Sequence, residues 1–277
     1  MVDTIQSGVV DHQRALAMPL AALAITGLVL ACEPTVLIGS CPPPSESDAG
    51  EAGAAGAASE DAVGPWSTGF EDGLCGYHAA RGYCYARHDA ALEIVRTPAH
   101  SGNFAAAFTV NGNATTADRS QARCVTQGAM PKSATYGAWY RIPVKQISDG
   151  NWNLFHFLGG VSEADSHPLW DVSLATDTDG LLKLSVYNFL NRSRSDLSSV
   201  PEVPIDGWFH VEFQLTRSAQ ANGEVTLRQD NVVIFHQANL ITDDTDWGQW
   251  YVGNYAKTLV PSLSTVYVDD VEIREDP

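Results

Sequence analysis

Residues 208–216 of the chain read WFHVEFQLT, and their pattern decides the fold class. Large apolar side chains occupy every second position, at Phe209, Val211, Phe213 and Leu215. Successive side chains of a β-strand point to opposite faces, so this alternation predicts a strand with one face on a core. Trp208, His210, Glu212 and Gln214 are then expected on the opposite face.

The segment that follows predicts a β-hairpin. EVTLRQ (224–229) and VVIFHQ (232–237) are separated by Asp230-Asn231. A tight two-residue hairpin turn requires positive φ angles, and Asp and Asn tolerate them better than most residues. The sequence therefore predicts two antiparallel strands joined at residues 230–231.

The same kind of pattern extends back to Pro65 and forward to the C-terminus. Short apolar-rich runs alternate with Gly, Asn, Asp, Ser and Pro, and no helical period of useful length occurs. Further strands are expected over 66–70, 91–96, 104–110, 119–126, 135–142, 152–158, 169–175, 181–187, 247–254 and 265–274. A dozen short strands in about 210 residues predict an all-β domain over 65–277, built as a two-sheet antiparallel jelly-roll sandwich.

Composition limits the function classes. Among the 277 residues, 44% are hydrophobic, which is enough for a core of this size. The formal net charge is −17, and residues 1–64 contribute eight carboxylates and one arginine to it. The folded part thus stays acidic, which argues against nucleic acid as a partner, because binding phosphate backbones needs a basic patch.

The N-terminal segment predicts export. Residues 18–31 (MPLAALAITGLVLA) are apolar and uncharged, too short to span a bilayer comfortably but suited to a secretory signal over 1–31. The segment ends in Leu28-Val29-Leu30-Ala31-Cys32, which resembles the lipobox of bacterial lipoprotein precursors. That resemblance implies lipidation of Cys32 and anchoring at the cell envelope or cell surface. An ordinary cleaved signal or an uncleaved signal anchor are the alternatives.

A tether is expected between this anchor and the domain. Residues 42–64 (PPPSESDAGEAGAAGAASEDAVG) consist of Pro, Ser, Ala, Gly and acids, and such a stretch buries too little apolar surface to order itself. Residues 32–64 are therefore predicted to form a disordered linker that begins at the lipidated cysteine.

The remaining cysteines allow several arrangements. Cys41, Cys75, Cys84 and Cys124 show no CxxC or Cys/His metal spacing. In an oxidising compartment Cys75–Cys84 is the most economical disulfide, closing the loop CGYHAARGYC. Cys124 is then a buried thiol or pairs with Cys41, and four free, buried thiols remain the alternative.

Three motifs carry a resemblance to a known family. They are Gly69-Phe70-Glu71-Asp72-Gly73, His100-Ser101-Gly102-Asn103-Phe104-Ala105, and the last strand Val266-Tyr267-Val268-Asp269-Asp270-Val271. Together they resemble bacterial carbohydrate-active jelly rolls of the concanavalin A-like lectin/glucanase class. In that class the first and last strands pair, and an acid from each often holds a structural Ca²⁺. The resemblance implies Glu71 and Asp269 as calcium ligands, a hard oxygen set that suits this ion; solvated carboxylates at a sheet edge are the alternative.

Glucanases of this class carry paired acids spaced E-x-D-x-E on one strand, and the chain has no such run. Retaining hydrolysis needs two carboxyl groups about 5 Å apart. Glu212 and Asp171 are single acids in their strands. Glycoside hydrolase activity is therefore not expected.

Three other segments resemble the alginate-lyase type of polysaccharide lyase. Arg119-Ser120-Gln121-Ala122-Arg123 is similar to the lyases' Arg-rich strand, with Gln121 where they keep Glu. Asn153-Leu154-Phe155-His156 is similar to their Gln-x-His strand, with Leu154 in place of Gln. Trp250–Lys257 (WYVGNYAK) is similar to their late aromatic strand, with Tyr255 at the catalytic Tyr, Tyr251 replacing Lys and Lys257 replacing Gln.

If the lyase resemblance holds, it implies roles for three residues. Tyr255 is the acid/base, His156 is the base or neutraliser, and Arg123 binds the uronate carboxylate. Loss of the neutralising Gln weakens this assignment, because an unscreened carboxylate leaves the α-proton too weakly acidic. Asn153 compensates only if a strand bulge turns it into the groove.

A glycan-binding surface is expected on the same strands, because exposed aromatic rings stack on sugars while amide and charged groups bind their hydroxyls and carboxylates. The expected glycan contacts are Arg119, Gln121, Trp250, Tyr251, Asn254 and Lys257. The alternatives without glycan binding are core packing for the aromatic residues, solvated surface charges for the arginines, and a hydrogen-bonded structural role for His156.

These sequence features are compatible with three alternative functions. The first is a surface-anchored glycan-binding lipoprotein that recognises an extracellular polysaccharide. The second is a polysaccharide lyase that acts by β-elimination on a uronate-containing polymer. The third is a structural or adhesive envelope protein.

Overall fold

The computed structural model describes residues 36–37, 62–79, 82–113, 120–243 and 245–276. The chain divides into two units, Met1–Cys32 and Glu33–Pro277. The first unit, with the predicted signal and Cys32, lies outside the described residues, and so do residues 38–61 of the predicted linker. None of the helices described is long and apolar enough to cross a membrane.

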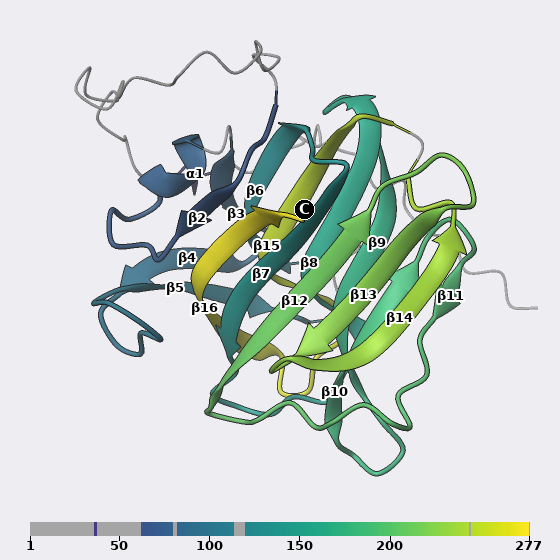
Figure 1. The fold of residues 1–277 in the computed structure, drawn as a ribbon. Helices are drawn as coiled ribbons and strands as arrows, with labels where there is room; N and C mark the ends of the chain where they lie inside the picture. Colours follow the sequence, from purple (N-terminus) through teal and green to yellow (C-terminus); the bar gives the residue numbers. More distant parts are fainter. Residues whose placement is uncertain (1–35, 38–61, 80–81, 114–119, 244, 277) are drawn as a thin grey trace, which may run out of the picture. The chain divides into compact units, whose positions relative to one another are not determined.

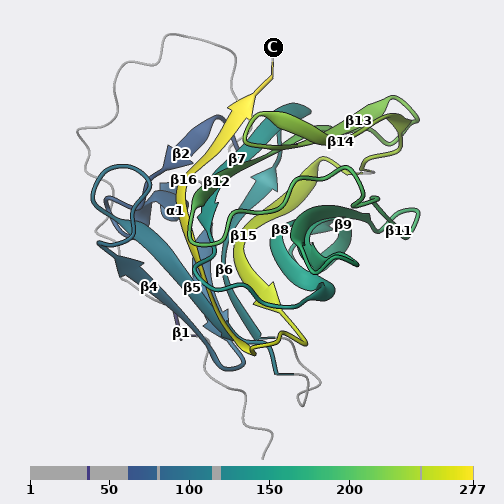
Figure 2. The same cartoon turned by 90° about the horizontal axis from the view of Figure 1, so that it is seen from below.

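The second unit consists of two antiparallel β-sheets (Figure 1). Sheet A has the order β1-β3-β6-β15-β8-β9-β10-β11. Its strands are β1 (Val36–Leu37), β3 (Tyr83–Arg87), β6 (Ser120–Ala129), β15 (Trp247–Ala256), β8 (Asp149–Ser162), β9 (Asp165–Thr176), β10 (Leu182–Asn188) and β11 (Ser193–Arg194). Figure 2 shows that β8 and β9 curve strongly along their length.

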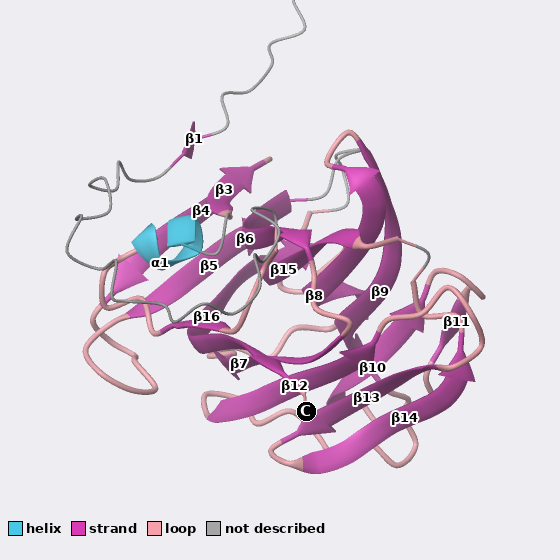
Figure 3. Cartoon of the chain, turned by 45° about the horizontal axis from the view of Figure 1, so that its top comes forward, coloured by secondary structure: helices cyan, strands magenta, loops and turns pink. Residues whose placement is uncertain are grey.

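Sheet B has the order β14-β13-β12-β7-β16-β5-β4, with β2 paired to β16. Its strands are β14 (Val232–Leu240), β13 (Gly223–Gln229), β12 (Trp208–Thr216), β7 (Ser133–Arg141), β16 (Leu263–Glu275), β5 (Ala105–Asn111), β4 (Ala90–Val95) and β2 (Trp66–Thr68). One short helix, α1 (Cys75–Ala79), accompanies the sheets among the described residues (Figure 3).

The sheets pack through aromatic side chains on their facing sides. Phe157 of β8 lies with its ring centroid 5.0 Å from that of Tyr136 on β7 and 4.8 Å from that of Phe213 on β12. Trp250 of β15 packs edge-on against Tyr136 at 5.1 Å. These residues are at most 3% exposed. Each large buried ring contributes roughly 2–3 kcal/mol by leaving water, so this interface holds the sandwich closed.

The alternation read from the sequence is confirmed. Phe209, Val211, Phe213 and Leu215 are buried in the core, whereas His210 and Gln214 are not fully buried. Asp230 and Asn231 have φ angles of 50° and 67°, as the predicted hairpin turn requires. All the other predicted strands are present with shifted ends, and β2 pairs with β16 as expected for first and last strands.

The predicted Cys75–Cys84 disulfide is wrong. Cys84 is bonded to Cys124 instead. The two residues lie directly opposite each other on β3 and β6, with their Cα atoms 4.0 Å apart. Proximity in sequence suggested the other pairing, but strand pairing brings together residues 40 positions apart. The alternative of four free thiols is excluded by the same bond.

The predicted linker is not free of structure throughout. Val36–Leu37 pairs with β3 at the edge of sheet A. Val63 is 5% exposed, and its backbone N–H donates to the carbonyl of Ala129. The prediction of disorder is therefore wrong for these residues, because the open edge of β3 and the end of β6 offer hydrogen-bond partners to the chain before Pro65.

Candidate functional site

The outer face of sheet A carries the candidate site. On β6, Ala122 and Cys124 point into the core, so Gln121, Arg123 and Val125 point outward. Val125 forms a small apolar cluster with Tyr85 and Tyr251 that is separate from the main core. The outer face is thus itself partly covered by side chains and holds Arg123 among them.

Arg123 is the central charged group. Its side chain is buried, with the residue only 6% exposed, and its Nη2 donates to Oδ1 of Asn153 at 2.9 Å. The guanidinium carbon lies 3.9 Å from the ring centroid of Tyr255 and 5.2 Å from that of Tyr251. No described carboxylate lies within ion-pair distance of it. A buried guanidinium held by one amide oxygen and two rings retains unpaired donors.

A register irregularity brings Asn153 and His156 to the same face. On an ideal strand, residues three apart point to opposite sides. The pairing of β8 with β9 shifts by one residue between Asn153 and Phe155, and the pairing with β15 shifts between Val252 and Tyr255. A β-bulge re-aims the side chains that follow it. Asn153 therefore reaches Arg123 while His156 stands over the same face.

His156 is held by a carboxylate on the neighbouring strand. It lies directly opposite Asp171 of β9, and its Nδ1 is hydrogen-bonded to Oδ1 of Asp171. Both side chains are 14% exposed. Burial alone raises the pKa of Asp171, but the charge and hydrogen bond of His156, with a smaller contribution from Arg123, outweigh burial and lower this pKa below its ordinary value. In the neutral form of the imidazole, a proton on Nδ1 is donated to this carboxylate and Nε2 is the acceptor nitrogen.

A cavity of about 290 Å³ opens beside this pair. Asn153, Asp171 and Ser173 line it from β8 and β9, and Tyr187, Phe189 and Arg194 line its other side. The exposed Arg194 donates to Oγ of Ser185 at 2.8 Å and to the carbonyl of Gly150 at 3.1 Å. The cavity therefore combines amide, hydroxyl, aromatic and cationic groups with the Asp171 carboxylate, a mixture that binds a polar ligand.

Several members of this site were not anticipated. Asp171 figured in the sequence only as an isolated acid, and Tyr187, Phe189 and Arg194 were not singled out. The periodicity of LWDVSL does place Asp171 opposite the core-facing Trp170 and Val172, which was the available signal. Its contact with His156 depends on strand order and register, which no local pattern reveals.

Two predicted glycan contacts are wrong. Trp250 is 1% exposed and packs between the sheets, and Asn254 is fully buried. The amide of Asn254 accepts from Trp152 Nε1 at 2.9 Å and donates to the carbonyl of Phe108 at 3.0 Å, so it serves the core. Alternation along β15 puts residues 250 and 254 on the inner face and Tyr251 and Tyr255 on the outer one.

Of the other predicted contacts, Tyr251 and Gln121 lie at the outer face. Tyr251 is 8% exposed, and its hydroxyl donates to Gln249 at 2.6 Å; burial raises its pKa, so the phenol stays protonated. Gln121 accepts from the Tyr85 hydroxyl at 3.2 Å. Lys257 follows the end of β15 and is partly exposed. Arg119 lies outside the described residues.

The two predicted calcium ligands, Glu71 and Asp269, are distant in sequence but contact the same loop, residues 100–104. Glu71 Oε1 accepts the backbone N–H groups of Asn103 and Phe104 at 2.7 and 3.0 Å. Asp269 Oδ2 accepts those of His100 and Ser101 at 2.8 and 3.2 Å. Both carboxylates therefore hold residues 100–104, and each of these four bonds is to a backbone N–H.

The two-sheet architecture is shared with solved structures, whereas no family model and no curated protein sequence matches the chain. The endo-β-1,4-glucuronan lyase of the fungus Trichoderma reesei superposes with a TM-score of 0.58 at 16% identity, covering 76% of this chain and 95% of that one. The cellulose-induced protein Cip1 superposes with a TM-score of 0.55 at 13% identity, covering 76% and 97%. The fold is a concanavalin A-like jelly roll.

An alginate lyase from Aplysia kurodai is also similar to this jelly roll, with a TM-score of 0.49 at 12% identity over 67% of this chain and 87% of that one. At 16% and 13% identity, the likeness to the glucuronan lyase and to Cip1 establishes the jelly roll alone. The chemistry of the chain rests on its own residues.

The pair of Asp171 and His156 makes a testable contribution to stability. The pKa of Asp171 is lowered from 3.8 in the folded state, so its ionised form stabilises the fold above that value, and the stabilisation is lost as the pH falls through the folded pKa. Asp171→Asn is expected to lower the free energy of unfolding by roughly 1.5–3 kcal/mol at pH 7, and by much less near pH 3. Urea unfolding at both pH values measures this difference.

The matched control for this measurement is Asp165→Asn, an exposed acid on the same strand. Its substitution is expected to change the free energy of unfolding by less than about 0.5 kcal/mol at either pH. An Asp171→Asn effect of equal size at pH 7 and pH 3 would contradict an ionised Asp171 in the fold.

Proposed function

We propose that the outer face of sheet A binds a uronate-containing polysaccharide. The observation that carries this proposal is Arg123, a buried guanidinium with no described carboxylate within ion-pair distance. A buried charge is costly unless it is paired, and a planar guanidinium matches a carboxylate in two parallel hydrogen bonds. The uronate carboxylate supplies the missing partner.

The surroundings of Arg123 support a sugar polymer over a small anion. Tyr255 lies against the guanidinium, and Tyr187 and Phe189 border the adjacent cavity. Aromatic faces suit the apolar sides of sugar rings. Arg194, which lines this cavity, provides a second cation. Two cations along one face attract an acidic polymer locally, although the chain as a whole is acidic.

A second candidate, β-elimination at the same site, is favoured by one observation: Arg123, His156 and Tyr255 all project from the outer face of sheet A. In this reaction Arg123 and Asn153 neutralise the uronate carboxylate, and Nε2 of His156 removes the proton on the carbon beside it. The electron pair forms a carbon–carbon double bond as the glycosidic C–O bond breaks. The Tyr255 hydroxyl donates its proton to the leaving oxygen. A glucuronan lyase with the same jelly roll supports this candidate.

One experiment tests both candidates. The purified chain is mixed with glucuronan, alginate and cellulose, and both pull-down and ultraviolet absorbance of unsaturated ends are followed. Binding to the two uronate polymers is expected, with Arg123→Gln weakening it at least tenfold, about 1.4 kcal/mol, and Arg123→Lys restoring only part of it. Arg228→Gln on sheet B is the matched control and is expected to bind as the unmodified chain does.

The two readouts separate the candidates. A rise in absorbance that His156→Gln and Tyr255→Phe each reduce at least a hundredfold, with binding retained, establishes a lyase. Binding without any unsaturated ends establishes a glycan-binding protein. Failure to bind either uronate polymer, or equal binding by the Arg123→Gln and Arg228→Gln variants, would count against the whole proposal and favour a structural or adhesive role.

We also propose a structural Ca²⁺ at Glu71 and Asp269. Carboxylate oxygens from the first and last strand regions gather at residues 100–104, and a hard oxygen set of this kind fits Ca²⁺. Asp270, next to Asp269 in the chain, accepts a hydrogen bond from Oγ of Ser101 in the same loop at 2.7 Å. Chelation with EGTA is expected to lower the melting temperature by several degrees, with recovery on adding Ca²⁺. Glu71→Gln should remove this response, and an unchanged melting temperature after chelation would exclude the ion.

The membrane anchor is a further proposal, carried by the sequence at Leu28–Cys32. Expression of the full chain in a bacterial host is expected to give a membrane-bound product whose N-terminal peptide carries acyl chains on Cys32. Cys32→Ser should release the protein from the membrane fraction. Mass spectrometry of that peptide decides the matter, and an unmodified Cys32 would contradict lipidation.

A further inference from the structure

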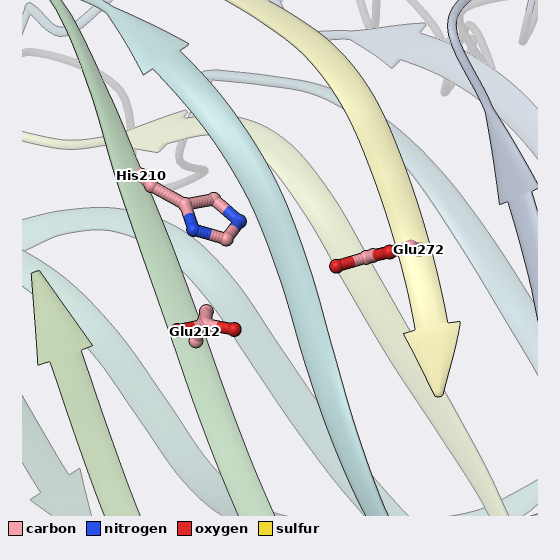
Figure 4. Close-up of side chains that lie close together, drawn as sticks. All are labelled: His210, Glu212 and Glu272. Atoms are coloured by element: carbon pink, nitrogen blue, oxygen red, sulfur yellow. The ribbon is translucent and has the colours of Figure 1, made fainter. Parts of the chain in front are cut away.

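The outer face of sheet B carries a second cluster of chemically active side chains. His210 and Glu212 lie two residues apart on β12, and Glu272 lies on β16, with β7 running between the two strands (Figure 4). One potential ligand atom of each residue lies within 4.8 Å of those of the other two. The three side chains lean toward one another across β7 (Figure 4).

A glycine on β7 makes the space for this convergence. Gly137 is the register partner of Glu212 on one side and of Glu272 on the other. A Cβ atom at Gly137 would lie 3.2 Å from Oε1 of Glu272 and 3.3 Å from Nε2 of His210. Any other residue would intrude on these two atoms, so the glycine leaves a shallow hollow with a nitrogen and an oxygen donor at its edge.

The orientation of His210 is fixed from its other side. Its ring stacks on Trp139 of β7 with centroids 4.9 Å apart and planes inclined by 16°. Trp139 in turn stacks on His100 at 3.8 Å. Stacking on Trp139 fixes the plane of the imidazole ring. Its two nitrogens lie on the edge of the ring, and neither forms a hydrogen bond to a described residue.

Arg274 balances part of the negative charge of the cluster. Its guanidinium pairs with Oε1 of Glu212, and its Nε lies 2.9 Å from Oε1 of Glu272. One cation thus serves two carboxylates, so the cluster keeps a net negative charge. The Arg274 side chain is 53% exposed and can turn into solvent, whereas that of Glu212 is only 11% exposed.

We propose that His210, Glu212 and Glu272 form a binding site for a divalent transition-metal ion of the Zn²⁺ class. One imidazole nitrogen and two carboxylate oxygens suit such an ion, whereas Ca²⁺ and Mg²⁺ prefer oxygen ligands alone. Ligand atoms around tetrahedral Zn²⁺ lie about 3.3 Å apart. Separations of up to 4.8 Å therefore close by modest side-chain rotations, with Arg274 displaced and a fourth position left to water.

Binding here would join β12 and β16 across β7 and so stabilise sheet B. The site lies on the sheet opposite Arg123 and does not depend on the polysaccharide proposal. It also differs from the calcium proposal in its ion, because Ca²⁺ is not expected to replace Zn²⁺ at an imidazole ligand.

Calorimetric titration of the full chain with ZnCl₂ tests the site. We expect one Zn²⁺ to bind with an affinity that Glu272→Gln lowers at least tenfold, and Gly137→Ala likewise by filling the hollow. Arg274→Gln is expected to raise the affinity several-fold, because it removes the competing cation. The matched control is His236→Ala. His236 lies on the same sheet outside the cluster, 3.7 Å from Glu224 and hydrogen-bonded to Thr226, and its substitution should not change the affinity.

Melting curves recorded without metal show whether each variant is folded. For the unmodified chain, zinc at one hundred times its dissociation constant should raise the melting temperature by roughly 5 °C. The Arg274→Gln variant keeps the test decisive even if Glu272→Gln or Gly137→Ala does not fold. Weaker zinc binding by Arg274→Gln, or equal losses in Glu272→Gln and His236→Ala, would overturn the proposal and leave the cluster as an ion-pair network. An X-ray absorption spectrum of the bound zinc that shows one imidazole nitrogen and otherwise oxygen ligands would support the proposal.

Discussion

The aromatic contact between the two sheets sets the position of nearly every functional group in this protein. Phe155 and Phe157 of β8 both face the core, where they meet Tyr140, Tyr136 and Phe213 of sheet B. Side chains on a strand alternate, so His156 between them has to face outward. The same rule places Arg123 outward between Ala122 and Cys124, and His210 outward between Phe209 and Val211. Both polar faces are consequences of how the core is filled.

Two buried arginines show how a structural charge differs from one that awaits a partner. Arg217 pairs with the carboxylate of Asp243 and donates to the backbone carbonyls of Met130, Thr245, Asp246 and Trp247. All its donor groups are occupied, as the cost of burying a charge demands. Arg123 is equally inaccessible but has one amide oxygen and two rings. Because the same chain can satisfy an arginine completely, the incomplete shell of Arg123 points to a ligand.

Period-two alternation predicted the strands well because each strand has one face on the core. The hairpin turn was predicted from a local property, the tolerance of Asp230 and Asn231 for positive φ angles. The errors have physical causes as well. Trp250 and Asn254 were grouped with Tyr251 and Tyr255 by residue type, although alternation along β15 separates them. The Cys84–Cys124 bond and the pairing of His156 with Asp171 depend on which strands are neighbours, and short-range patterns do not contain strand order. The register shift beside Asn153 is a property of three paired strands together.

Arg123 and the pair formed by His156 and Asp171 make different demands on the outer face of sheet A. Recognition of a uronate needs a fixed cation, and Arg123 satisfies that need whether or not the polymer is cleaved. A binding site gains little from holding an imidazole in one tautomer. Asp171 nevertheless stays ionised at the cost of partial burial and fixes the proton of His156 on Nδ1. An imidazole with its second nitrogen unprotonated is what proton abstraction requires. The arrangement around His156 is therefore the part of the site that favours chemistry over binding alone, and Arg123 is the part that both functions share.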